Sequence, residues 1–240
     1  MPEWFEEWFG EEYLALYPHR DADDAARLVA LLTRQIGWGA GWRVLDIACG
    51  PGRHAAPLDA AGLHVVGVDL SAVLLRKARE VTASPLVRGD LRQLPFRRGA
   101  VDAALNLFTS FGYFETDDEH AAALREMTSV VRSGGWFVLD YLHDAPVRAA
   151  LRGSVTDLAP GTAGTTRLQR RLTRDGRFVI KDILLPDGRH FLERVRLFSP
   201  AELTVMLCDA GVVVQRTFGD YGGGAMIPAA PRCLLLGRTS

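Results

Sequence analysis

The sequence has few cysteines, no long apolar run and almost no net charge. Its three cysteines, Cys49, Cys208 and Cys233, are odd in number and lack the spacing of a metal site. We therefore expect no bound metal, no disulfide framework and a reducing, cytoplasmic location. The first residues are acidic, and no apolar run approaches the ~18 residues of a membrane helix, so we expect neither a signal peptide nor a membrane span.

The balance of charge argues against a protein held to nucleic acid by its overall charge, because the formal net charge is only −1. The charges are unevenly distributed. Residues 1–30 hold eight acidic and two basic side chains, whereas residues 161–200 hold nine basic and four acidic ones. A composition of 48% hydrophobic and 24% charged residues is that of an ordinary globular protein, and 240 residues fit one enlarged domain better than two.

Short apolar strands alternate with helices through the middle of the chain, which predicts a parallel sheet with helices on both faces. One helix, over 117–132, is expected to stop at Gly134-Gly135. Two further strands follow near the C-terminus. The expected fold is a doubly wound, Rossmann-like α/β sheet of seven strands, over 43–47, 64–68, 85–88, 101–107, 136–141, 212–217 and 232–237.

Two segments exceed what this sheet needs. Residues 1–40 are predicted to form a helical cap, whose first turns place Trp4, Phe5, Trp8 and Phe9 on one aromatic face. Residues 142–197 contain three β-rich runs separated by Asp-Gly turns, which predict an antiparallel β insertion after the fifth strand. The whole chain, 1–240, is then a single domain that carries a cap and an insertion.

A glycine turn and three acidic residues indicate a nucleoside ligand. Gly50 and Gly52 follow the first strand, where the absence of a Cβ lets backbone approach a ligand. Asp69 ends the second strand and is placed to bind ribose hydroxyls, and Asp90 is placed to accept from an adenine amino group. Asp46 suits a ligand that carries an ammonium group. Residues 50–55 also match GxGxxA, so an NAD-type oxidoreductase is the alternative.

Three motifs resemble those of the class I S-adenosylmethionine-dependent methyltransferases. They are VLDIACGPGRHA, VVGVDLS and VRGDLRQLPF, and Ala48 stands where many members have glycine. The resemblance implies S-adenosylmethionine as cofactor and S-adenosylhomocysteine as product. It implies that Leu91 packs near the adenine and that Asn106 and Leu107 lie by the methionyl part. The expected cofactor-binding residues are Asp46, Ala48, Cys49, Gly50, Gly52, Asp69, Leu70, Asp90, Leu91, Asn106 and Leu107.

The chain also resembles a narrower group of small-molecule methyltransferases with an added β-subdomain, through WFGEEYLALYPHRD, NLFTSFGYF and FGDYGGG…PRCLLLGR. We therefore expect methyl transfer to nitrogen or oxygen of a small molecule by direct in-line displacement. Such a displacement needs alignment and water exclusion more than a catalytic group. Tyr113 and His143 are the candidate general bases, and each has the alternative of a merely structural role. The loop 219–230 is a candidate wall of the substrate site.

Other functions and partners stay as alternatives. An RNA or protein methyltransferase and a non-catalytic cofactor-binding module both fit the same fold. The basic insertion interleaves Arg167, Arg171 and Lys181 with acids, which is typical of a solvated sheet face, so nucleic acid is not the expected partner. A homodimer through the hairpin edge or the aromatic face is left open, and no membrane contact is expected.

Overall fold

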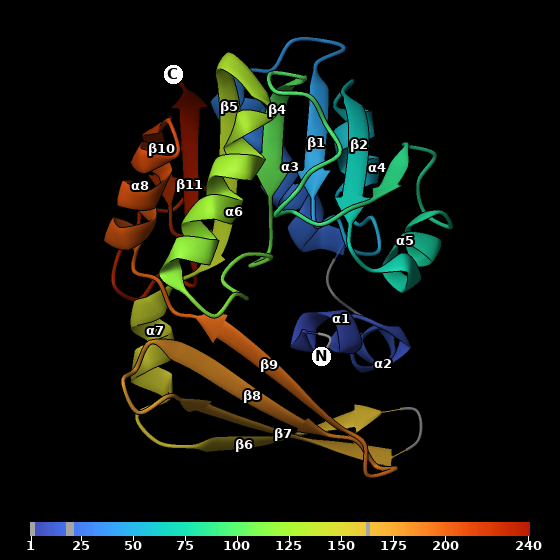
Figure 1. Ribbon diagram of the computed structural model, residues 1–240, viewed down its shortest axis with the longest axis vertical. Coiled ribbons are helices and arrows are strands. Elements are labelled where there is room, and N and C mark those ends of the chain that lie inside the picture. The colour runs from blue at the N-terminus through green and yellow to red at the C-terminus, as the bar shows by residue number, and fades with distance from the viewer. Residues whose placement is uncertain (1–2, 18–21, 162–163) are drawn as a thin grey trace.

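The computed structural model describes residues 3–17, 22–161 and 164–240, which form two sheets (Figure 1). The larger sheet has the order β10-β11-β5-β4-β1-β2-β3. β11 is antiparallel to both of its neighbours and every other pairing is parallel. The predicted seven-stranded fold is confirmed. Its strands are β1 (Arg43–Ile47), β2 (His64–Asp69), β3 (Leu86–Arg88), β4 (Val101–Asn106), β5 (Val131–Leu142), β10 (Val212–Phe218) and β11 (Arg232–Thr239).

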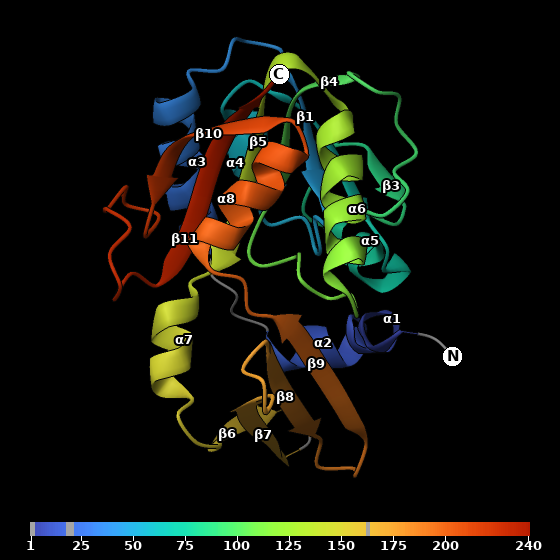
Figure 2. The ribbon, with the colours of Figure 1, turned by 60° about the vertical axis from the view of Figure 1, so that its left-hand side comes forward.

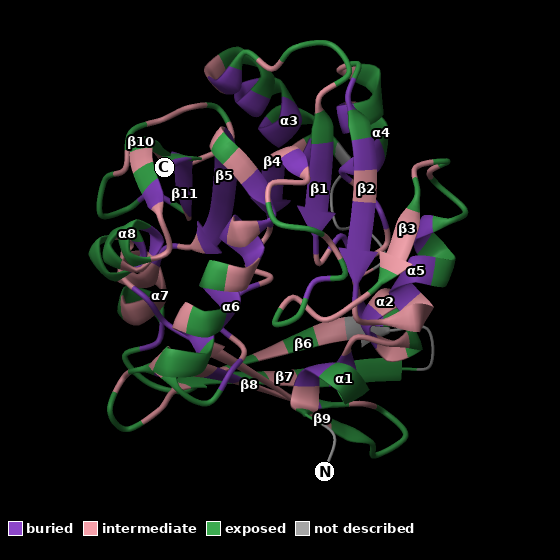
Figure 3. Cartoon of the chain, turned by 45° about the horizontal axis from the view of Figure 1, so that its top comes forward, coloured by how far each residue is buried: buried purple, intermediate pink, exposed green. Residues whose placement is uncertain are grey.

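Helices cover both faces of this sheet because each presents one apolar face to it. On one side, Leu28 and Leu32 of α3 pack with Val44 of β1. On the other, Leu124 of α6 and Leu203 of α8 pack with the opposite face of the strands. In Figure 3 the central strands β1, β4 and β5 are mostly buried, whereas the edge strands β3 and β10 are largely intermediate or exposed. The core helices are α3 (Ala22–Ile36), α4 (Ala55–Ala60), α5 (Ala72–Ala78), α6 (Asp117–Ser129) and α8 (Pro200–Asp209).

The predicted stop of α6 at Gly134-Gly135 is wrong. The helix ends at Ser129, and both glycines lie within β5. The pairing of β4 with β5 shifts register next to them, between Val101 and Ala103 of β4. A Cβ at position 135 would lie 2.5 Å from the Val131 side chain. The glycines therefore accommodate an irregular strand start instead of ending a helix.

The insertion keeps the predicted bounds of 142–197 but contains more elements than the sequence predicts. It begins with a helix, α7 (Asp144–Ala150), and continues as an antiparallel sheet of order β6-β7-β8-β9. Three of these strands match the predicted runs, whereas α7 and the first strand were not predicted. The chain returns to the core through β9 (Figure 2). The strands are β6 (Val155–Gly161), β7 (Gly164–Leu172), β8 (Phe178–Leu184) and β9 (His190–Arg196).

The N-terminal segment divides into two parts instead of forming one cap. α3 packs on the large sheet, whereas α1 (Trp4–Trp8) and α2 (Glu11–Leu16) lie between the two sheets (Figure 1). Trp8 is fully buried, with its ring centroid 5.1 Å from that of Phe191 and its Nε1 donating to Glu193 Oε1 at 2.7 Å. We call α1, α2 and the four-stranded sheet the lid. Within the described ranges, every helix is too short or too polar to cross a membrane.

Candidate active site

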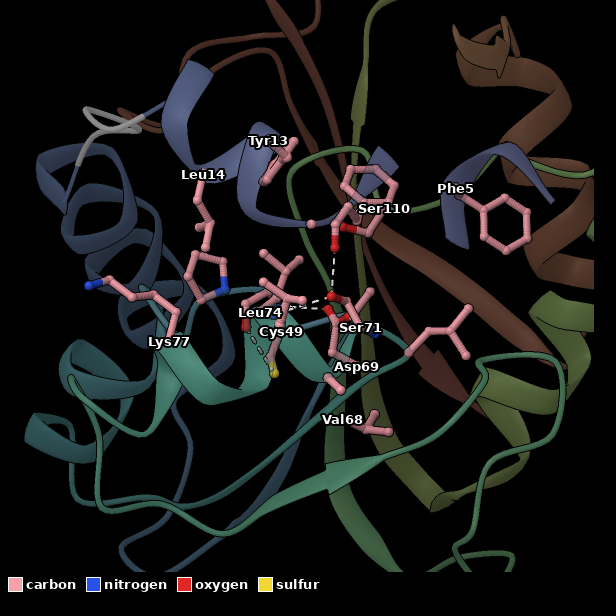
Figure 4. Close-up of a pocket in the computed structure, with 18 of the residues that line it drawn as sticks. Phe5, Tyr13, Leu14, Cys49, Val68, Asp69, Ser71, Leu74, Lys77 and Ser110 are labelled. Atoms are coloured by element: carbon pink, nitrogen blue, oxygen red, sulfur yellow. Dashed lines mark hydrogen bonds between the residues drawn. The ribbon is translucent and has the colours of Figure 1, made fainter. Parts of the chain in front are cut away.

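A large cavity of about 1320 Å³ lies at the carboxyl ends of β1, β2 and β4, under α1 and α2. The core contributes the turn after β1 and the ends of the neighbouring strands. The lid contributes Phe5, Phe9 and Tyr13. Figure 4 shows Tyr13, Asp69 and Ser110 around this space. Binding sites for one small molecule usually measure about 300–1,000 Å³, so this cavity has room for a cofactor and part of a second molecule.

Asp69 is fixed at the centre of the cavity wall. It is 8% exposed, its Oδ2 accepts from the backbone N–H of Gly50 and its Oδ1 from that of Ser71, both at 2.8 Å. Burial raises the pKa of this carboxyl, although the backbone donors oppose the rise. The Ser71 hydroxyl donates to the Phe9 carbonyl oxygen at 2.6 Å and so connects the lid to the core. Because a carboxylate accepts about four hydrogen bonds, Asp69 can also accept from ligand hydroxyls.

The two glycines of the turn do different work. Gly50 lines the cavity at φ +57°, and a Cβ there would meet nothing within 4 Å, so the backbone is open to a ligand. Gly52 has φ +80° and does not line the cavity. A Cβ at Gly52 would lie 3.0 Å from the Ala78 Cβ of α5. The predicted ligand contact fits Gly50, whereas Gly52 permits the turn to pack against a helix. Ala48 is also left-handed, at φ 58°.

Asp46 lies beneath the turn and does not line the cavity. It is 2% exposed, and burial raises its pKa to about 7, with Arg53 lowering and Asp69 raising the value. Among the described residues, its Oδ2 has no hydrogen-bond partner. The nearest ring nitrogen, His54 Nδ1, is 4.0 Å away, and burial lowers the pKa of that imidazole to about 3. Asp46 is therefore a buried carboxyl group next to the site, with one oxygen that lacks a hydrogen bond from the described residues.

Asp90 and its neighbour Leu91 both line the large cavity, as the sequence predicts. The carboxylate of Asp90 is held by Arg92, whose Nη2 donates to Oδ2 at 2.6 Å and whose backbone N–H donates to Oδ1 at 2.8 Å. Burial alone would raise the pKa of Asp90, but the bonds from Arg92 outweigh it and lower the pKa. Asp90 is thus an ionised acceptor at the cavity edge.

A strained turn follows β4 and separates two cavities. Phe108 and Thr109 adopt positive φ values of 59° and 64°, which non-glycine residues rarely do. Asp140 holds both, since its Oδ2 accepts from the Phe108 N–H at 2.8 Å and its backbone oxygen accepts from the Thr109 N–H at 2.9 Å. Arg232 donates to Asp140 Oδ1 at 2.9 Å. Asn106, by contrast, is fully buried and does not line the cavity, and its amide donates to the carbonyl oxygens of Ile47 at 3.3 Å and Ser110 at 3.5 Å.

A small cavity of about 450 Å³ lies on the other side of this turn, between the core, α7 and the four-stranded sheet. Phe9, Tyr13, Phe108 and Tyr113 line both cavities and form the partition between them. The Tyr113 hydroxyl donates to the Thr109 carbonyl oxygen at 2.6 Å. The predicted candidate Tyr113 therefore stands where the two spaces meet.

The second candidate base is not brought to either cavity. His143 is 5% exposed, and its Nδ1 lies 2.7 Å from the Ala230 carbonyl oxygen. The loop 219–230 does not wall the site either. Asp220 accepts from the backbone N–H groups of its own loop, and the Tyr221 hydroxyl donates to Asp140 Oδ2 at 2.7 Å. His143 and the loop 219–230 therefore lie outside both cavities, and Tyr221 bonds Asp140, which in turn holds the turn between them.

The sequence did not single out several lining residues. Arg53 follows the glycine turn and places its guanidinium 3.8 Å from the centroid of the Phe108 ring. Its only sequence signal is its place within the motif VLDIACGPGRHA. The structure brings together the predicted Ala48, Cys49, Gly50, Asp69, Leu70, Asp90, Leu91, Leu107 and Tyr113, and leaves Asp46, Gly52, Asn106 and His143 off the cavity surface.

These residues fit an adenosyl sulfonium ligand. The open backbone at Gly50 and the carboxylates of Asp69 and Asp90 suit an adenosine, whose ribose and amino group are hydrogen-bond donors. The aromatic rings of Phe9 and Tyr13 suit a sulfonium cation, which aromatic faces attract. The buried, unpaired Oδ2 of Asp46 favours a cationic group over a pyrophosphate near the turn.

Comparison with known proteins gives two kinds of relative. Residues 44–135 match the family described as methyltransferase domain. A demethylmenaquinone methyltransferase from Corynebacterium kroppenstedtii is 42% identical over 95 residues, 40% of this chain and 39% of the relative. The chain thus matches only about two fifths of the length of such relatives. A dTDP-3-amino-3,4,6-trideoxy-alpha-D-glucopyranose N,N-dimethyltransferase from Streptomyces venezuelae is 26% identical over 92% of both chains.

Solved structures resemble the whole chain, lid included. The CcbJ methyltransferase from Streptomyces caelestis has a TM-score of 0.81 at 21% identity and covers 97% of this chain and 98% of its own. A sugar N-methyltransferase from Streptoalloteichus has a TM-score of 0.70 at 26% identity, and the match covers 96% of this chain and 93% of that structure.

The strand order and the adenosyl-type site define a class I methyltransferase fold. Residues 44–135 match the methyltransferase domain, and the whole chain has the fold of S-adenosylmethionine-dependent methyltransferases of known structure, one of them solved with S-adenosylmethionine bound. This sets aside the dinucleotide alternative.

Proposed function

We propose that the protein transfers a methyl group from S-adenosylmethionine to the nitrogen of a small-molecule amine of the amino-sugar type. One observation carries the proposal. The relatives that match the chain from end to end include an N,N-dimethyltransferase and a sugar N-methyltransferase, whereas the demethylmenaquinone methyltransferases match only part of it. Since the lid forms much of the wall around both cavities, relatives that share the lid are the better guide to the acceptor.

The cofactor would be held by residues of the large cavity. When bound, S-adenosylmethionine supplies a methyl group on a sulfonium, and its sulfur leaves as a neutral thioether when a nitrogen lone pair attacks. Asp69 would accept from the ribose hydroxyls and Asp90 from the adenine amino group. Arg53, which lines the same cavity, would pair with the cofactor carboxylate.

The protein's own contribution is to align the amine and exclude water. The Tyr113 hydroxyl donates its proton to the Thr109 carbonyl, so its oxygen keeps lone pairs that can accept an N–H of the acceptor. This contact would orient the nitrogen toward the large cavity. The lid covers the site, and the Ser71–Phe9 hydrogen bond holds the lid against the core.

Methyl transfer from S-adenosylmethionine with a deuterated methyl group tests the proposal. The protein is incubated with a panel of amino sugars, their hydroxyl analogues and quinols, and products are read by mass spectrometry. We expect labelled N-methyl products from amino sugars. A group that moves a proton contributes about 10²–10⁴-fold to the rate. Because Tyr113 only orients the amine, we expect Tyr113→Phe to lower kcat by less than that, about tenfold. Transfer to oxygen or carbon alone, or cofactor binding without any transfer, would contradict the proposal.

A further inference from the structure

The small cavity has charged walls in an otherwise apolar setting. From the four-stranded sheet, Arg170, Lys181 and Glu193 line it, and Arg232 lines it from the core. The sheet residues beside them are Val179 and Val195. Three cations and one carboxylate therefore face a space that lies next to the proposed site of methyl transfer.

Two of these cations are direct neighbours across the sheet. Arg170 of β7 is paired in register with Lys181 of β8, and Lys181 is paired with Glu193 of β9. Residues directly opposite on antiparallel strands have Cβ atoms about 4.5–5.5 Å apart, and like charges there are destabilising. An anion between the two side chains would relieve that repulsion.

The carboxylates that accompany these cations hold them only weakly. Arg170 pairs with Asp157 at 2.6 Å, but both side chains are nearly half exposed, and exposed pairs contribute about 0–1 kcal/mol. Lys181 Nζ is 3.5 Å from Glu193 Oε2, while the other carboxylate oxygen of Glu193 accepts from Trp8. Lys181 also donates to the Tyr17 hydroxyl. Both cations retain donors for a ligand, since an ammonium has three N–H bonds and a guanidinium five.

Arg232 completes the site from the opposite wall. Its Nε and Nη2 bind Asp140, and Nη2 also binds the Thr109 hydroxyl at 3.1 Å. Its Nη1 makes no hydrogen bond to any residue that the structure describes. The ion pair with Asp140 fixes the guanidinium in place.

We propose that the small cavity binds an anionic group of the acceptor, a phosphoryl or a carboxylate group, between Arg170 and Lys181 on the sheet and Arg232 on the core. The proposal rests on the proposed function, because it assigns the part of the acceptor that does not react. Binding that group beyond the Tyr113 partition would anchor the acceptor while its amine reaches the large cavity. Charge-assisted hydrogen bonds of this kind are about twice as strong as neutral ones.

Calorimetry on the full chain saturated with S-adenosylhomocysteine tests this site. At constant ionic strength, one arm titrates pyrophosphate and the other malonate, so that a phosphoryl preference and a carboxylate preference are distinguished. We expect one anion to bind, and Arg170→Gln and Lys181→Gln each to weaken it by about tenfold or more, the effect of losing one charge-assisted bond.

Arg171→Gln is the matched control. Arg171 is the next residue on β7 but faces away from the cavity, is exposed to a similar degree and pairs with Asp182 at 3.5 Å. Its substitution should leave anion binding unchanged. Absence of binding by both anions, or equal weakening in Arg171→Gln and Arg170→Gln, would overturn the proposal. Failure of S-adenosylhomocysteine to bind would instead overturn the proposed function, so the two failures are separable.

Discussion

At the scale of single residues, the two glycines of the turn after β1 have different surroundings. Gly50 has open space where a Cβ would stand, and that space belongs to the large cavity. Gly52 has the Ala78 side chain there instead. A motif written as two equivalent glycines thus contains one residue that is open to the cavity and one that is packed against a helix.

The two glycines should therefore respond differently to substitution. Gly50→Ala should cost about 1–2 kcal/mol of stability, the usual penalty for an L-residue in the left-handed region, and should weaken S-adenosylhomocysteine binding about tenfold or more. Gly52→Ala adds overpacking of about 1–3 kcal/mol to the same penalty and should leave affinity nearly unchanged. Urea unfolding and calorimetry measure both quantities. The reverse pattern would show that the assignment of the two glycines is wrong.

Asp46 makes the stability dependent on pH. Its folded-state pKa of about 7 is raised from an ordinary 3.8 by burial, so the folded state binds the proton more tightly than the unfolded state. The stability that this group contributes is fully present below pH ~4 and is lost as the pH rises through about 7.

Asp46→Asn should remove this dependence. We expect the variant to gain stability relative to the wild type between pH 5 and pH 8, by on the order of 1–3 kcal/mol. Chemical denaturation of both proteins at several pH values measures the difference. A difference that stays constant over this range would mean that Asp46 does not titrate as its burial implies.

At the scale of elements, the lid is the part that the sequence described least well. The hairpin signals at Asp175-Gly176 and Pro186-Asp187-Gly188 predicted β7, β8 and β9, because local turn chemistry sets those pairings. No comparable signal marks α7 or β6, and the Pro160 within β6 argues against all but an edge strand, which β6 is. The Gly134-Gly135 pair resembled the end of a helix because glycine is common both after the last turn of a helix and at irregular positions in a strand.

The lid should be separable from the core by one substitution. Trp8→Ala removes a fully buried ring that contacts β9, a loss of about 3–5 kcal/mol for such a residue. Phe5 of α1 packs with the core, but α1 and α2 lie outside the large sheet and its covering helices. We therefore expect rapid proteolysis near the N-terminus and weaker S-adenosylhomocysteine binding, with the core still folded by near-UV circular dichroism.

Trp38→Ala is the control for this experiment, since Trp38 packs with the α3 side of the core, outside the lid. The Trp38→Ala variant should lose some stability but keep the wild-type affinity for S-adenosylhomocysteine. Equal loss of affinity in both variants would indicate that the lid does not act separately.

At the scale of the molecule, the sequence could predict many of the residues that line the large cavity but few of those that line the small one. Asp69, Asp90 and Gly50 lie at strand ends of a regular sheet, where spacing along the chain fixes position in space. Arg170, Lys181 and Arg232 come from two sheets, and only the folded chain shows that they face one cavity. His143 shows the converse, since a strand-end residue that looked suitable is turned toward Ala230.

The account depends most directly on an adenosyl site built around Asp69, and one measurement tests it. Titration of S-adenosylhomocysteine into the wild type should give a dissociation constant in about the micromolar range, and Asp69→Ala should weaken it at least about tenfold, since two ribose hydroxyls would lose a buried charged acceptor. NADH should show no binding. Unchanged affinity in Asp69→Ala, or binding of NADH but not of S-adenosylhomocysteine, would contradict the account.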